Sequence, residues 1–132
     1  MSFDYTAMLV DQSAVANGTV TINTALTVNG KPSTTYMFAN KTPFEGYPIG
    51  VKVNSATSNA QCVLTVQESV DGTTALAGGN QLVITVTGAQ GYKASRWVGS
   101  GLAQYIIGTA VVTNGPITDL EIGWALNDSQ LP

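Results

Sequence analysis

Eight carboxylates are the side chains of this sequence best suited to acid and base chemistry. A glycosidase needs two of them on either side of a cleft, and a calcium loop needs oxygen ligands at a regular spacing such as Asp-x-Asp-x-Asp. Neither pattern occurs. Glu68 is expected at the end of a strand and Asp71 in a turn, so we expect both to be solvated. The carboxylates are Asp4, Asp11, Glu45, Glu68, Asp71, Asp119, Glu121 and Asp128.

Nucleophilic and metal chemistry is limited by the absence of histidine from the chain. Ser-His-Asp and Cys-His catalysis, and the usual zinc and copper sites, therefore lack a component. The one cysteine, Cys62, lies in an apolar segment and is expected to act as a small buried hydrophobe. We therefore predict that the chain is not an enzyme, with no catalytic, cofactor-binding or metal residues.

Aromatic and basic side chains are the candidates for contact with a partner. Several lie in the proline-rich segment Lys31 to Gly50, which is expected to be a long loop of the functional or interface-forming kind. Its aromatic rings could fill a subunit interface, plug the end of a barrel or stack on a sugar. Lys93 and Arg96 flank Trp97 as cation–π partners or as ordinary solvent-facing charges. The candidate contact residues are Tyr36, Phe38, Phe44, Tyr47, Arg96 and Trp97.

The charge content is low. Charged residues make up 10% of the chain, against about 25% in a typical soluble domain. Its five basic residues are scattered and the net charge is −3, so no basic patch for nucleic acid is expected. No apolar run reaches the ~20 residues of a membrane span, and the N-terminus has no signal-peptide pattern, so synthesis in a cytoplasm is expected. A surface of Ser, Thr, Asn, Gln and Gly suits a protein packed against others.

The elements that would position these residues are strands. We expect an N-terminal arm or edge strand over residues 1–16 and a single β-sandwich domain over 17–132, with a long loop at 31–50. Turn pairs such as Asn17-Gly18, Asn29-Gly30 and Asp71-Gly72 separate the runs. The pattern predicts an all-β antiparallel sandwich or jelly roll of about seven to nine strands. The expected strands are Tyr36–Ala39, Val51–Val53, Leu82–Val86, Tyr92–Val98, Ala103–Thr113 and Leu120–Leu126, with the clearest at Thr19–Val28 and from Gln61.

Two stretches resemble capsid cement (decoration) proteins of tailed bacteriophages. One is the strand Val-Leu-Thr-Val-Gln-Glu-Ser from Val63, followed by the acidic turn Val-Asp-Gly-Thr-Thr. The other is Tyr-Lys-Ala-Ser-Arg-Trp-Val from Tyr92, followed by a strand ending Gly-Thr-Ala-Val-Val. Asp-Gln-Ser-Ala from Asp11 fits the start of such proteins loosely. The likeness covers about Ser55 to Leu126 and leaves the loop from Tyr36 to Pro48 unmatched.

The resemblance implies a small jelly-roll protein, often a homotrimer, that sits on the virion and bridges subunits of the major capsid protein. No cofactor, nucleic acid or membrane is expected as a partner. Two alternatives stay open. One is a coat or tail-tube subunit that builds the particle itself. The other is a carbohydrate-binding β-sandwich that uses Tyr36, Phe44, Tyr47 or Trp97.

Overall fold

The computed structural model describes residues 9–22, 27–28, 31–32, 47–98 and 105–124. These residues form strands, turns and bends, and no helix occurs among them. Eight longer strands make two four-stranded antiparallel sheets. The strands, with the short pair β3 and β4, are β1 Val10–Val15, β2 Gly18–Thr21, β3 Thr27–Val28, β4 Lys31–Pro32, β5 Tyr47–Asn54, β6 Gln61–Ser69, β7 Gln81–Thr87, β8 Tyr92–Trp97, β9 Tyr105–Thr113 and β10 Ile117–Trp124.

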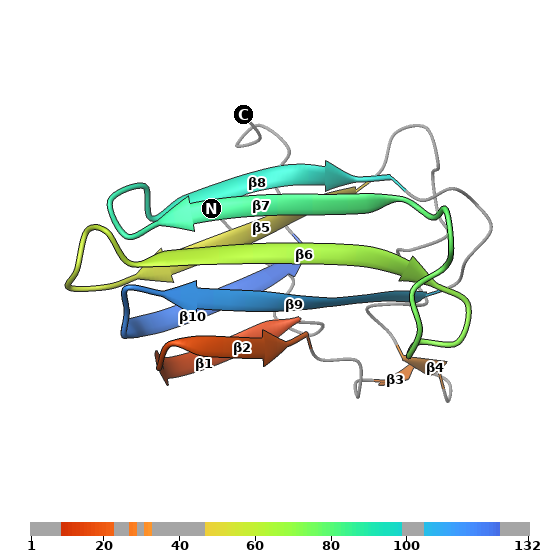
Figure 1. Ribbon diagram of the computed structural model, residues 1–132, viewed down its shortest axis with the longest axis horizontal. Helices are drawn as coiled ribbons and strands as arrows, with labels where there is room; N and C mark the ends of the chain where they lie inside the picture. Colours follow the sequence, from red (N-terminus) through yellow and green to blue (C-terminus); the bar gives the residue numbers. More distant parts are fainter. Residues whose placement is uncertain (1–8, 23–26, 29–30, 33–46, 99–104, 125–132) are drawn as a thin grey trace.

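The sheets have the orders β1-β10-β5-β8 and β2-β9-β6-β7, and the second lies in front of the first in Figure 1. Along the chain each of the eight longer strands lies in the opposite sheet from the one before it, except that β7 follows β6 in the same sheet. Eight strands wound in this way are a jelly roll. The predicted fold class is therefore confirmed.

Alternating side chains build the core between the sheets. Along β6, Cys62, Leu64 and Val66 are fully buried, while the residues between them are half-exposed. β7 contributes Ile84 and Val86 in the same alternation, because successive strand residues point to opposite faces. The buried aliphatic and aromatic side chains form one continuous cluster that contains Trp97 and Trp124. This single core fixes which face of each strand is left for contact with other molecules.

The strand boundaries differ from the prediction at β5. Tyr47 to Gly50 were expected to end a long loop, but they form the first half of this strand. Pro48 is tolerated because the pairing of β5 with β10 begins only at Ile49, so no described strand on that side needs its missing N–H. The expected strand Tyr36–Ala39 lies outside the described residues. Of the expected strand Thr19–Val28, the structure describes β2 and β3 but not residues 23–26.

The core position of Leu64 gives a direct stability test. Leu64 is fully buried, with Ile84 and Ala110 as its cross-strand neighbours. Leu64→Ala should lower the free energy of unfolding by about 2–5 kcal/mol, because it leaves a cavity in a packed core. Urea denaturation measures the change. Val63→Ala is the matched control, since Val63 is half-exposed on the opposite face. A loss well under 1 kcal/mol for Leu64→Ala would contradict the assigned face.

Candidate protein interface

The outer face of the β2-β9-β6-β7 sheet is composed differently from the rest of the surface. Cross-strand pairs such as Val63 with Val111 and Thr65 with Thr109 place these residues in rows across the sheet. The face is made of threonine, glutamine, valine and isoleucine. We call it the neutral face. Its residues are Thr19, Thr21, Gln61, Val63, Thr65, Gln67, Gln81, Val83, Thr85, Thr87, Ile107, Thr109, Val111 and Thr113.

The neutral face carries no charged side chain among the residues that the structure describes. The outer face of the other sheet differs, since it holds five charged residues. There, Lys52 Nζ lies 3.5 Å from Glu121 Oε2 in an ion pair. The five residues are Asp11, Lys52, Arg96, Asp119 and Glu121. The sandwich is thus charged on one side and neutral on the other.

Aliphatic side chains on the neutral face are open to solvent. Val83 is 53% exposed and Val111 is 38% exposed. Exposed valines within a hydroxyl and amide surface resemble the composition of interface cores, which are depleted in charged residues. Such a face can be dehydrated against a partner without the cost of stripping water from a charge. The arrangement therefore supports contact with another protein better than it supports catalysis.

A groove of about 360 Å³ indents the neutral face where β2 meets the loop after β6. Its lining includes Thr21, Thr65, Gln67, Thr73 and Ile107. The lining is neutral, like the face around it, and supplies hydroxyl and amide groups beside an apolar side chain. The groove gives the neutral face a shape feature that a partner side chain could enter.

The loop beside the groove is held by a network around Asp71. Asp71 Oδ1 accepts the backbone N–H groups of Thr73 and Thr74 at 2.8 Å each. Ser69 Oγ accepts the N–H of Gly72 at 2.9 Å and donates to the Thr74 carbonyl at 2.6 Å. Gly72 has a φ of 79°, as expected for the predicted Asp-Gly turn. The N–H groups of Thr74 and Thr73 hold the pKa of Asp71 below its usual value of 3.8.

This lowered pKa predicts an acid-sensitive loop. The contribution of ionised Asp71 to stability is present above the pKa of the unfolded chain and is lost as the pH falls through the lower folded value. Wild type should therefore melt at a higher temperature than Asp71→Asn near neutral pH, and the two should converge in acid. Melting temperatures of both proteins between about pH 6 and about pH 2 measure this. A difference that stays constant over the whole range would contradict it.

Glu68 does not lie where the sequence predicted. It was expected to be solvated, but it is 1% exposed, on the inner face of β6. Its carboxylate Oε2 accepts the N–H of Asn80 at 2.6 Å, and its backbone N–H donates to the Asn80 carbonyl at 3.3 Å. The Glu68 carbonyl accepts the N–H of Leu76 at 2.8 Å. Glu68 lies near the end of β6, and the loop between β6 and β7 folds back onto it. The hydrogen bonds of Glu68 to Asn80 and Leu76 therefore hold this loop in place.

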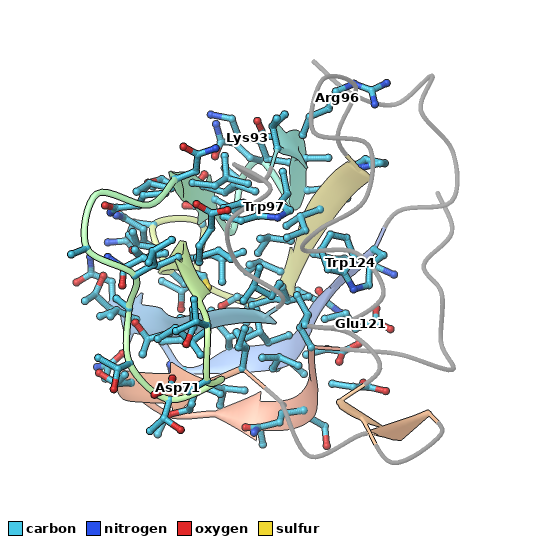
Figure 2. The ribbon with its side chains drawn as sticks, turned by 90° about the vertical axis from the view of Figure 1, so that its right-hand side faces the viewer. Asp71, Lys93, Arg96, Trp97, Glu121 and Trp124 are labelled. Atoms are coloured by element: carbon cyan, nitrogen blue, oxygen red, sulfur yellow. The ribbon has the colours of Figure 1, made fainter. Side chains whose placement is uncertain are left out.

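Of the predicted contact residues, the structure describes Tyr47, Arg96 and Trp97, which lie close together on β5 and β8 but do not share one exposed surface. Trp97 is 1% exposed and belongs to the core, so its predicted place at a contact surface is corrected. It lies on the inner side of β8, whereas Arg96 is exposed on the outer side (Figure 2). Tyr47 begins β5 and pairs with Trp97 through the backbone. Tyr36, Phe38 and Phe44 lie outside the described residues.

The sequence offered no pattern that pairs two of the carboxylates, whereas the structure makes two of them cross-strand partners. Asp11 on β1 and Glu121 on β10 are cross-strand partners on the outer face, and Lys52 is the partner of Glu121 on the other side. The separation of Asp11 from Glu121 in the chain hid this pairing. Within the described ranges, no three His, Cys, Asp or Glu side chains gather as a metal site would require.

Cys62 occupies the core, as predicted. Burial raises the pKa of its thiol to about 11, so the thiolate is scarce at neutral pH and the residue is a poor nucleophile. Among the residues that the structure describes, there is no helix long and apolar enough to cross a membrane.

The neutral face was missed by the sequence prediction, which placed the functional surface on the N-terminal arm and the 31–50 loop. The available signal was the identity of the outward residues. From Gln61 to Gln67 in β6, along β7 and from Ile107 to Thr113 in β9, the outward positions hold Thr, Gln, Val or Ile, where a charged residue is common on a solvated face. A scan against protein families, a search of curated proteins and a search of solved structures each find no match to this chain.

Proposed function

We propose that this chain is a structural protein of a virus particle, a capsid cement or decoration protein that binds the shell of major capsid subunits and stabilises it without catalysis. The observation that carries the proposal is the neutral face. A sheet face on which no described residue is charged lowers the solubility of a protein. A protein partner that covers this face explains its composition.

Three further observations support the proposal. The jelly roll is a fold that viral capsid domains use, although a fold by itself does not establish a function. The low charge of the chain limits repulsion between copies crowded on a particle. The resemblance of the segments from Val63 and Tyr92 to phage cement proteins points to the same class. Weak contacts of one copy add up when many copies bind one particle.

The test is the particle itself. Virions that contain the chain should be purified, and its copy number should be measured against the major capsid protein by quantitative mass spectrometry. Virions made without the chain should assemble but lose infectivity faster on heating or osmotic shock. Equal robustness with and without the chain would refute the cement function. Failure to assemble without it would instead identify a coat or tail-tube subunit.

A further inference from the structure

We propose that the free edge of β7 pairs with β7 of a second copy, so that two chains form a two-fold dimer with one continuous eight-stranded sheet. Among the strands that the structure describes, β7 is the last of the β2-β9-β6-β7 sheet, and only β6 pairs with it. The inference concerns the chain alone and does not depend on the proposed function.

The hydrogen-bonding groups that would make this contact are identified by the pairing of β7 with β6. The Gly88 N–H donates to the Ala60 carbonyl, and the Glu68 N–H donates to the Asn80 carbonyl. In an antiparallel pair the bonded positions recur at every second residue. Leu82, Ile84 and Val86 therefore direct their N–H and C=O groups toward β6. Gln81, Val83, Thr85 and Thr87 direct theirs to the free edge.

The hydrogen bonds of Thr87 agree with this assignment of edge groups, and they mark where the free edge of β7 ends. Its N–H donates to Gln90 Oε1 at 3.0 Å, and its carbonyl accepts the N–H groups of Gln90 at 3.1 Å and Gly91 at 3.0 Å. The turn after β7 thus occupies the edge groups of Thr87. Those of Val83 and Thr85 have no strand opposite them in the described part of the chain.

The other three edge strands carry features that discourage edge-to-edge pairing. β1 holds the charged Asp11 and is interrupted by Ala14, which has a left-handed φ of 63° and drops out of the register. β2 has only four residues. β8 exposes Lys93 and Arg96 (Figure 2). β7 has seven residues and contains no charge, no proline and no left-handed residue.

A second copy fits this edge because the strand is self-complementary. With the two-fold axis at Ile84, Val83 of one copy faces Thr85 of the other, and the free N–H and C=O groups of both residues are satisfied. On the inner side Leu82 faces Val86 of the second copy, and Ile84 faces its own copy. No like charges are placed opposite each other along the pair.

Sedimentation velocity on the purified chain, from micromolar to millimolar concentration, tests the dimer. We expect a monomer–dimer equilibrium that stops at two chains, with the dimer abundant only at high concentration because one short strand buries little surface. β8 lies against β7 and exposes Lys93 and Arg96, so in the proposed dimer the cations of the two copies come near each other and added salt should strengthen the dimer. A monomer at every concentration, a trimer, or a dimer weakened by salt would overturn the proposal.

Variants locate the contact. Thr85→Pro removes a free-edge N–H without removing a bond to β6, so it should abolish the dimer while the fold persists by circular dichroism. Val83→Lys should raise the dissociation constant of the dimer at least tenfold. This variant tests the contact if Thr85→Pro does not fold. Val111→Lys is the matched control, because the same change lies on the neutral face away from the edge, and it should leave the dimer intact. A dimer that survives Val83→Lys and Thr85→Pro, or is lost in Val111→Lys, would contradict edge pairing.

Amide hydrogen exchange gives an independent measurement. The amides of Val83 and Thr85 should become protected as the concentration rises, whereas those of Leu82, Ile84 and Val86 should be protected already in the monomer. Unchanged exchange of Val83 and Thr85 in the dimer would also exclude the proposed contact.

Discussion

Trp97→Ala should lower the free energy of unfolding by about 3–5 kcal/mol, the range for removing a large aromatic side chain from a packed core. Trp97 is 1% exposed on the inner side of β8 and belongs to the main hydrophobic cluster. Within the described residues its indole Nε1 has no hydrogen-bond acceptor, so the contribution of this side chain comes from packing. Urea denaturation of the purified chain measures the change.

The control for Trp97 is Lys93→Ala on the same strand. Lys93 is exposed, and a surface substitution of this kind usually changes stability by less than about 0.5 kcal/mol. If Trp97→Ala were as mild as Lys93→Ala, the side chain would not be part of the core. If Trp97→Ala lost glycan binding while its stability was unchanged, Trp97 would be a contact residue, as the sequence predicted.

On the proposed capsid-binding function, Val111→Lys should weaken attachment of the chain to the particle by at least about tenfold. Val111 lies in a central row of the neutral face beside Val63, and an ammonium buried there against a partner would lack a counter-charge. The fold should be retained because Val111 is already 38% exposed. Binding of purified variants to particles that lack the chain, followed by co-sedimentation, measures the effect.

Asn54→Lys is the matched control for attachment. It adds the same charge at an exposed position of β5, on the outer face of the opposite sheet. We expect it to bind particles like the wild type. Equal loss in both variants would indicate a general effect of charge, and full binding by Val111→Lys would show that the partner covers a different surface. Because Val111→Lys should still dimerise, the two proposals can fail separately.

Much of the fold could be predicted because strand signals are local. Alternation in β6, β7 and β9, and the Asp71-Gly72 turn, follow from neighbouring residues alone. β5 was predicted too short because Pro48 and Gly50 are typical of a loop. Pro48 fits only because β10 does not extend alongside it, and that fact depends on a strand more than sixty residues away.

The candidate interface could be predicted less well. Glu68 was expected in solvent, and only the return of the following loop, with the Asn80 N–H on its carboxylate, shows why it is buried. Trp97 was expected at a contact surface, because an aromatic residue directly after a basic residue is typical of either a surface or the inner side of an edge strand. The pairing of β8 with β5 decides in favour of the inner side.

The sequence by itself determined that the chain is all-β, where most turns fall, and which residues of each strand share a face, since side-chain direction repeats every two residues. It also excluded the chemistry that needs histidine. Only the tertiary structure decided which strands are neighbours, because β1 meets β10 and β2 meets β9 through contacts between distant parts of the chain. That pairing gathers the uncharged positions onto one sheet face, leaves β7 as the last described strand of its sheet, and places Asp11 beside Glu121.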